Sequence, residues 1–73
     1  MKERLLKVIN IVRNNKGLGE LKIIENNNTL MGDIGFDSLD LAEFTVRCEV
    51  EFGVDIFEDS IVSTIEEVMQ KLK

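Results

Sequence analysis

Apolar residues recur at helical spacing in three stretches of this chain and predict three main helices. In the first stretch, residues 3–12, the positions expected on the buried face are Leu5, Val8, Ile9 and Val12, joined by Leu6 and Ile11. Arg13 and Lys16 follow, where they favour the negative end of a helix dipole, and the Asn-Asn-Lys-Gly run at 14–17 predicts a stop. We therefore expect the first helix to end near residue 15.

The second stretch, residues 38–52, carries clear signals for both of its ends. Asp37 is a good N-cap residue with Asp40 three positions on, and Gly53 supplies the left-handed residue that ends a helix. Residues four apart lie on the same face of a helix, so the spacing identifies two faces here. The face expected to be buried carries Phe44, Cys48 and Phe52, and the face expected to be exposed carries Glu43, Arg47 and Glu51.

The remaining sequence predicts a long first connection, a minor helix and a last helix. Residues 17–37 are rich in Gly and Asn, and we expect their apolar residues to anchor the loop on the bundle: Leu21, Ile23, Ile24, Leu30 and Ile34. Residues 21–23 could be misread as a strand, but no partner strand is evident. A short turn of helix is expected at 58–62. The last helix begins at Ser63 or Thr64, since Ser63 with Glu66 and Thr64 with Glu67 both fit a capping box. Its apolar face holds Ile65, Val68, Met69 and Leu72. We predict one all-α domain over residues 1–73, a four-helix bundle of three main helices and one short helix.

Composition removes several classes of function. The chain of 73 residues contains one cysteine and no histidine, which excludes an internal disulfide and the usual zinc frameworks. No apolar run approaches the length of a membrane span, and the charged start does not match a secretory signal, so we expect a cytoplasmic protein. Residues 33–59 hold nine carboxylates and one base, a net −8, while the rest of the chain sums to +3. The acidic middle disfavours nucleic acid and would attract basic protein surfaces.

The run Gly35-Phe36-Asp37-Ser38-Leu39-Asp40 places a serine where the long loop turns into the second helix. Ser38 could cap that helix, act as a nucleophile or be a point of covalent attachment. A nucleophilic serine needs a base, usually histidine, and the bases nearest in sequence are only Lys22 and Arg47. A serine hydrolase is therefore disfavoured.

Two other features invite metal or redox chemistry and fit it poorly. A calcium loop counted from Asp33 would place Gly35, Ser38 and Phe44 at positions that need a ligand, a glycine and a glutamate. The EF-hand register therefore fails, although weak divalent binding to the acidic face stays open. Cys48 lies in line with two phenylalanines and is expected to pack as a small apolar residue.

Residues 30–44, LMGDIGFDSLDLAEF, resemble the modification site of acyl carrier proteins, where an Asp-Ser-Leu serine follows an aspartate, aliphatic, glycine turn. The similarity extends over nearly the whole chain: the second helix ends in Glu-Phe-Gly, Val-Asp-Ile follows at 54–56, and Thr-Ile starts the last helix. The resemblance implies a four-helix bundle with 4′-phosphopantetheine joined to the oxygen of Ser38 through a phosphodiester. A phosphate there would meet free N–H groups and the positive end of the helix dipole.

The resemblance further implies a discrete carrier and not an enzyme. It would be a monomer holding acyl groups as thioesters for fatty acid, polyketide or related biosynthesis, and a holo-synthase would install the arm from coenzyme A. Partner enzymes with basic docking surfaces would contact an apolar patch and its acidic surroundings. The patch is Leu39, Ala42 and Val46, and the acidic residues are Asp37, Asp40, Glu43 and Glu49.

This chain departs from the fatty-acid form of the family at several positions, which leaves the pathway open. Phe57 stands where a proline is common, Arg47 interrupts the acidic helix, and Phe36 and Phe44 are bulky. One alternative is an aminoacyl or peptidyl carrier of a secondary-metabolite or cell-surface pathway. Another is an unmodified acidic helical interaction module in which Ser38 only caps a helix.

Overall fold

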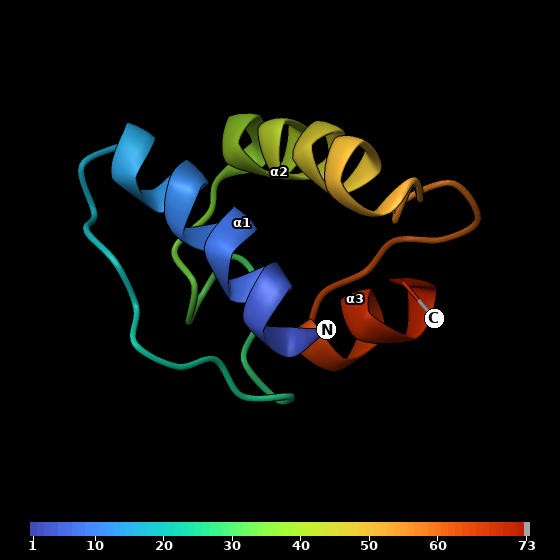
Figure 1. Ribbon diagram of the computed structural model, residues 1–73, viewed down its shortest axis with the longest axis horizontal. Coiled ribbons are helices and arrows are strands. Elements are labelled where there is room, and N and C mark those ends of the chain that lie inside the picture. The colour runs from blue at the N-terminus through green and yellow to red at the C-terminus, as the bar shows by residue number, and fades with distance from the viewer. Residues whose placement is uncertain (73) are drawn as a thin grey trace.

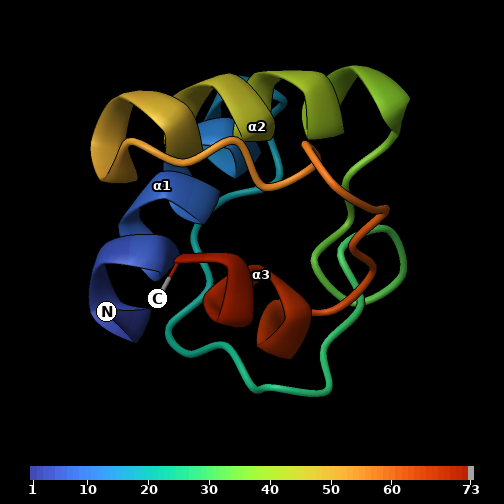
Figure 2. The same cartoon turned by 90° about the vertical axis from the view of Figure 1, so that its right-hand side faces the viewer.

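Three helices and two irregular connections make up the fold in the computed structural model, which describes residues 1–72. The helices are α1 (Lys2–Asn15), α2 (Ser38–Phe52) and α3 (Ile65–Leu72). α1 and α2 pack against each other, and α3 lies below α2, on the side of α2 that faces the core (Figures 1 and 2). The first connection, residues 16–37, and the second connection, residues 53–64, complete the described chain. The all-α prediction and the three main helices are confirmed.

The predicted fourth helix at 58–62 is wrong. The second connection turns at Asp55, whose carboxylate accepts a hydrogen bond from the Phe57 N–H at 3.0 Å, and whose carbonyl accepts one from the Glu58 N–H at 3.2 Å. Residues 58–60 then form a bend, not a helical turn. So short a helix is costly to nucleate and needs packing to hold it. Ile61 is 83% exposed and supplies none.

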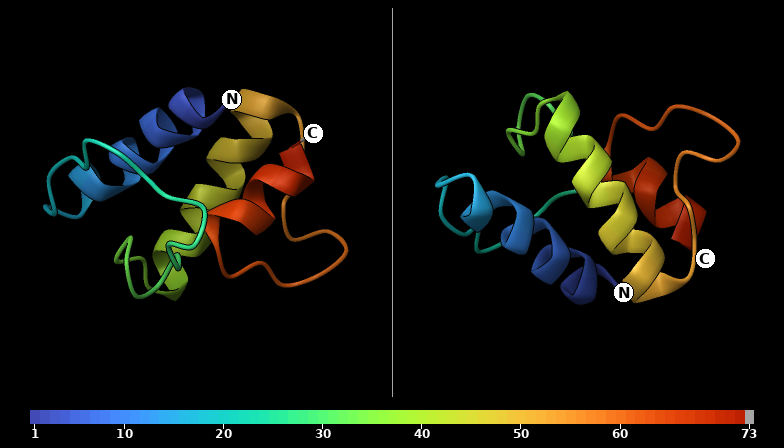
Figure 3. Two further views of the ribbon diagram at one scale, coloured as in Figure 1. Left: turned by 90° about the horizontal axis from the view of Figure 1, so that it is seen from below. Right: turned by 90° about the horizontal axis from the view of Figure 1, so that it is seen from above.

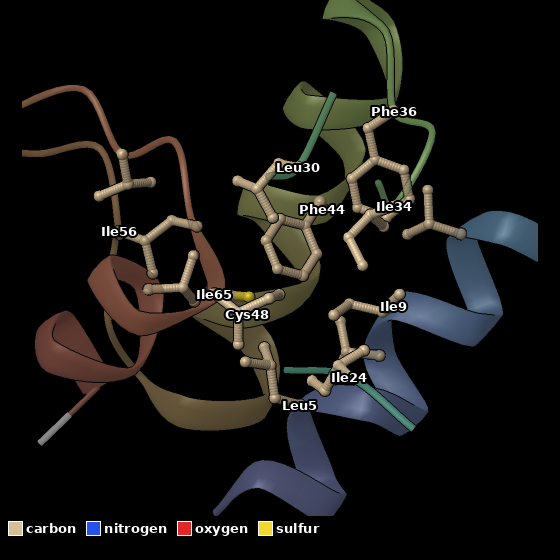
Figure 4. Close-up of a cluster of buried hydrophobic side chains, with 14 of the residues drawn as sticks. Leu5, Ile9, Ile24, Leu30, Ile34, Phe36, Phe44, Cys48, Ile56 and Ile65 are labelled. Atoms are coloured by element: carbon tan, nitrogen blue, oxygen red, sulfur yellow. The ribbon is translucent and has the colours of Figure 1, made fainter. Parts of the chain in front are cut away.

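A single core forms where the inner faces of all three helices meet both connections (Figure 4). The expected buried face of α3 is confirmed, with Met69 half-buried, and so are the four main positions of α1; Leu6 is half-buried, whereas Ile11 is 44% exposed and its predicted burial is wrong. Phe44 and Cys48 of α2 are fully buried, and Phe44 packs against Phe36 with ring centroids 5.3 Å apart. Phe52, which we expected to be buried, is only half-buried because it lies at the helix end beneath the Arg4 guanidinium, 4.8 Å from its ring centre.

The first connection is anchored in the core as predicted, with one exception. Ile24, Leu30 and Ile34 are buried and Leu21 is half-buried, whereas Ile23 is 69% exposed. The chain is extended here without a strand, and neighbouring side chains point in different directions, so consecutive isoleucines cannot both enter the core.

The first connection is also tied to the start of α3 by backbone hydrogen bonds. The Leu30 N–H donates to the Ser63 carbonyl at 2.9 Å, and the Ile65 N–H donates to the Asn28 carbonyl at 3.0 Å. These bonds flank an isolated antiparallel bridge between Thr29 and Thr64, and the described residues contain no longer strand pairing. The segment that precedes Ser38 is therefore hydrogen-bonded to the backbone at the start of the last helix.

α1 and α2 converge at one end and diverge at the other (Figure 3). They are closest where α1 begins and α2 ends, and there Arg4 Nη2 lies 2.7 Å from Glu51 Oε2. They spread apart toward the end of α1 and the start of α2. The first connection fills the space below this open end, and long cationic side chains span it.

The start of α3 resolves the choice between the two predicted capping boxes. Thr64 Oγ1 accepts the Glu67 N–H at 3.3 Å, and Glu67 Oε1 accepts the Thr64 N–H at 3.0 Å. The Thr64 and Glu67 box is thus the one that forms. None of the helices described is both long and apolar enough to cross a membrane.

Candidate functional site

Ser38 is the first residue of α2, and its neighbour Asp37 performs the capping. Asp37 Oδ1 accepts the Asp40 N–H at 2.9 Å, and Asp40 Oδ2 accepts the Asp37 N–H at 3.0 Å, so the two aspartates form a complete capping box. The predicted N-cap is confirmed. Ser38 is exposed at the N-terminal end of the helix, and its hydroxyl is not required to hold the cap.

A tight turn ahead of Asp37 sets the direction in which the chain enters α2. Gly35 has φ of +89°, a conformation that side-chain-bearing residues rarely adopt, and an added Cβ would lie 3.2 Å from Leu18 Cδ1. Asp33 closes the preceding turn, since its carboxylate accepts the Thr29 N–H at 2.8 Å. Ile34 and Phe36 are buried on either side of Gly35. These anchors leave Ser38 facing solvent.

Two cations at the end of α1 hold this turn in place. Arg13 donates to the carbonyls of Ile34, Leu18 and Gly19, in the last case at 3.1 Å. Lys16 Nζ donates to the Gly35 carbonyl at 3.1 Å and forms an ion pair with Asp40. Both residues were expected only to favour the helix dipole, and these contacts were not predicted. The only signal for them was their position at the end of α1, since the pairing is tertiary.

Asp40 is not the exposed carboxylate that the sequence analysis expected. It is 9% exposed, because the capping box and the Lys16 ammonium hold it against the end of α1. The Asp37 backbone N–H and then the Lys16 ammonium donate to it and hold its pKa below the usual value. The hydrogen bond to Asp40 in turn raises the pKa of Lys16.

Glu43, also expected to be an exposed carboxylate, is half-buried and has two partners. Its Oε2 atom lies 2.9 Å from Arg47 Nε and accepts a hydrogen bond from Asn15 at 3.0 Å. The Arg47 guanidinium and then the Asn15 amide hold the pKa of Glu43 below its usual value. Glu49 is exposed on the far side of the helix. The negative charge of α2 is therefore partly neutralised on the side that faces α1.

An apolar stripe runs along the outer face of α2. We define it as Leu39, Ala42, Val46 and Val50. Leu39 is 82% exposed and Val46 is 62% exposed, which agrees with their predicted place on the surface. Val50, at 83% exposed, extends the stripe and was not identified from the sequence, although it lies four residues after Val46. Beside it, Val8 and Ile11 of α1 help line a groove of about 310 Å³.

A second apolar hollow lies between the two connections, close to the start of α2. Its volume is about 240 Å³, and its lining includes Met31, Leu41, Phe57 and Ile61. Leu41 is three residues after Ser38, so the hollow opens within one helical turn of the serine. The residues that line it are mostly apolar.

Cys48 and the acidic residues offer little metal or redox chemistry. Cys48 is fully buried, and burial raises the pKa of its thiol to about 12, which keeps it protonated and unreactive at neutral pH. The prediction that it packs as a core residue is confirmed. Within residues 1–72, no three side chains of the ligating types are arranged to hold a metal ion.

The arrangement around Ser38 suits a hydroxyl that receives a group and not one that attacks unaided. Lys16, which reaches the segment around Ser38, is bound to Asp40, and this contact leaves it unsuited to act as a free base for the serine proton. The first turn of a helix offers free N–H groups and partial positive charge, which favour an attached phosphate. The exposed hydroxyl at this position therefore fits a phosphodiester-linked group installed by another protein.

Comparison with known proteins identifies the family of the chain as a whole. The family described as "phosphopantetheine attachment site" matches residues 7–72. The acyl carrier protein of Zymomonas mobilis is 36% identical over 61 residues, which cover 84% of this chain and 77% of that protein. The acyl carrier protein of Lactobacillus acidophilus is 32% identical over 69 residues, covering 92% of this chain and 85% of that protein. No solved structure matches significantly.

Proposed function

The chain belongs to the acyl carrier protein family, with a phosphopantetheine attachment domain over residues 7–72, and from that premise we propose that Ser38 is its attachment residue. The observation that carries the proposal is the exposed Ser38 hydroxyl at the start of α2, with Asp37 performing the cap. When bound, 4′-phosphopantetheine supplies a terminal thiol that holds an acyl group as a thioester. Carriers of this family are not enzymes, and we assign no catalytic residue to this chain.

We expect a holo-synthase to transfer the arm from coenzyme A to Ser38. Incubation of the chain with coenzyme A and a broad-specificity holo-synthase should raise its intact mass by one phosphopantetheine. Ser38→Ala should remove the modification while keeping the fold, because Asp37 remains to cap α2. Modification of the Ser38→Ala variant would move the site elsewhere. An unchanged mass for the wild type would favour the unmodified interaction module.

A matched variant at the cap itself distinguishes the capping role from the attachment role. Asp37→Ala should lower the free energy of unfolding by about 1 kcal/mol, as the loss of an N-cap does. Ser38→Ala should cost much less. A larger loss for Ser38→Ala in urea unfolding would assign the capping role to the serine.

The apolar stripe of α2 is the proposed contact surface for partner enzymes. Leu39, Ala42 and Val46 were expected to be ringed by Asp37, Asp40, Glu43 and Glu49. The burial of Asp40 and the pairing of Glu43 shift the proposed electrostatic part of this surface toward Asp37 and Glu49, which are exposed. Opposite charge on a partner mainly raises the rate of association, and salt weakens the effect.

The two carboxylates Glu49 and Glu43 offer a direct test of that surface. Glu49→Lys should slow phosphopantetheine transfer at low salt more than Glu43→Lys does, with a smaller loss at high salt. Both variants change the net charge equally, so charge alone cannot explain a difference. Equal transfer rates for both variants and the wild type would assign recognition to the apolar stripe alone.

The cargo is proposed to be an acyl group in fatty acid, polyketide or related biosynthesis. The relatives are named acyl carrier proteins, which favours acyl over aminoacyl or peptidyl cargo. The hollow lined by Leu41, Phe57 and Ile61 lies near Ser38 and could shelter an apolar chain. A chain loaded with a short fatty acyl group should melt at a higher temperature than the unloaded form, whereas a loaded amino acid should leave the melting temperature unchanged.

A further inference from the structure

Lys16 reaches across the open end of the α1 and α2 pair to the segment that carries Ser38. Its ammonium donates to the Gly35 carbonyl at 3.1 Å, pairs with the Asp40 carboxylate and lies 3.8 Å from Asp37 Oδ2. These three groups stand within three residues of Ser38, two before it and one after it. A single side chain therefore fixes the backbone on both sides of the serine.

The same contacts set the charge around the serine. Asp37 and Asp40 place two carboxylates beside a hydroxyl that, in the proposed function, must meet an anionic donor. Lys16 offsets one of these charges, and its side chain is 28% exposed, so solvent screens it only in part. The raised pKa of Lys16 and the lowered pKa of Asp40 agree with a pair that stays ionised near neutral pH.

We propose that Lys16 is a positioning residue for the transfer of phosphopantetheine to Ser38, holding the cap closed and offsetting the carboxylates beside the hydroxyl. This inference rests on the proposed function. In the transfer, the Ser38 oxygen forms a bond to the β-phosphorus of coenzyme A as the bond to the 3′,5′-ADP leaving group breaks. The serine proton passes to a base of the holo-synthase. Lys16 touches none of the reacting atoms and acts through Gly35, Asp37 and Asp40.

A graded set of variants separates the geometry from the charge. Lys16→Met removes the bonds and the charge, Lys16→Gln keeps donor groups without charge, and Lys16→Arg keeps both. We expect kcat for transfer to fall about tenfold in Lys16→Met and less in Lys16→Gln, with most of it restored in Lys16→Arg, because a small displacement of a reacting group is costly. KM for the carrier should not rise, because the loss of Lys16 removes a positive charge beside Asp37 and keeps the carboxylates of the proposed docking surface.

The matched control is Arg4→Met, which removes the ion pair between α1 and α2 at their other end. It changes the net charge by the same amount and should leave kcat near that of the wild type. Hydrogen exchange of the Asp37 N–H, which donates to Asp40, gives a readout on the unmodified chain. That N–H should exchange faster in Lys16→Met and Lys16→Gln than in Arg4→Met.

Each result bears on one claim. Wild-type kcat in a folded Lys16→Met variant, a loss confined to KM, or an equal loss in Arg4→Met would overturn the role of Lys16 and leave the carrier assignment standing. If Lys16→Met fails to fold, Lys16→Gln with wild-type kcat and wild-type exchange would overturn it instead. A wild-type chain that never accepts the arm would overturn the carrier assignment and, with it, this inference.

Discussion

The two connections of this protein differ in how they are held, and the difference explains where Ser38 is placed. The first connection, residues 16–37, is held by Arg13 of α1, by Lys16 at its own start, by the turn between Thr29 and Asp33, and by backbone bonds to the start of α3. The second connection, residues 53–64, has one local turn at Asp55 before it meets the first connection at Ser63. The connection that leads to Ser38, the proposed attachment residue, is thus the better fixed of the two.

The comparison shows that a segment without regular secondary structure can be held as firmly as a helix when its side chains are buried in the core. Ile24, Leu30, Ile34 and Phe36 bury their side chains from the first connection, while the second connection contributes Ile56 and Val62 to the buried core. Stability in a domain of this size comes from such burial, because a small core leaves little in reserve. We expect substitutions in the first connection to cost more than similar ones in the second.

The largest effect is expected from a pair of phenylalanines, one in each connection. Phe36→Ala should lower the free energy of unfolding by about 3–5 kcal/mol, because the side chain is buried against Phe44. Phe57→Ala should cost about 1–2 kcal/mol, since that side chain is half-buried. Urea unfolding measures both. A greater loss for Phe57→Ala would reverse the ranking of the two connections.

A pair of glycines gives the next effect. Gly35 and Gly53 both have positive φ, 89° and 74°, so alanine at either should cost about 1–2 kcal/mol. Gly35→Ala should cost more, because its Cβ would lie 3.2 Å from Leu18 Cδ1, whereas a Cβ at Gly53 meets open space. Thermal melts of the two variants test this. Equal melting temperatures would show that Leu18 moves aside freely.

Acidification should reveal a smaller difference in stability between the helix caps that follow the two connections, at the start of α2 and at the start of α3. Hydrogen bonds hold the pKa of Asp40 below its ordinary value in the folded state, and the backbone N–H groups of Ser63 and then Thr64 do the same for Glu67. Each carboxylate therefore contributes stability above its unfolded pKa, near 4, and loses it as the pH falls through the folded value.

Unfolding at a series of pH values from 7 to 2 measures these contributions. Asp40→Asn and Glu67→Gln should each be less stable than the wild type at pH 7, and the difference should shrink as the solution is acidified. Asp40→Asn should show the larger difference, since it also loses the Lys16 ion pair. A difference that stays constant down to pH 2 would mean that neither carboxylate changes its protonation on unfolding.

The smallest effect concerns unpaired charge. The second connection carries Asp55, Glu58 and Asp59, and none of them forms an ion pair within residues 1–72, whereas Asp40 and Glu43 each have a cation. Millimolar magnesium should raise the melting temperature by about 2–4 °C by relieving this repulsion. A Glu58→Gln/Asp59→Asn double variant should respond less. The same response in both proteins would place the repulsion outside the second connection.

Local signals predicted the main elements of the fold. The caps of α2 at Asp37 and Gly53, and of α3 at Thr64 and Glu67, depend on neighbouring residues, and all of them form as expected. The buried faces of the helices followed from spacing. The Asp-Ser-Leu pattern likewise located Ser38 at the start of α2.

The predictions that were wrong or missing all concern residues whose surroundings are set by tertiary contacts. Within 58–62 only Val62 is buried, which is too little packing to hold so short a helix, and Ile23 and Ile11 lie on the outer sides of their segments. Asp40 was expected to be one of the exposed carboxylates of the second helix, but the end of α1 covers it. Lys16 lies far from Asp40 in the sequence, so no local pattern could pair them.

The backbone bonds between the first connection and α3 have a consequence for synthesis of the protein. Leu30 and Asn28 pair with Ser63 and Ile65, which leave the ribosome long after Ser38 does. Closing so large a loop delays the step on which the Gly35 turn depends, even though the chain is helical. A nascent chain that stops short of α3 lacks the support that orders its serine. If Ser38 is the attachment residue, as proposed, we expect a holo-synthase to modify the chain efficiently only after α3 has been synthesised and has packed, so that the modified fraction would follow the folded fraction.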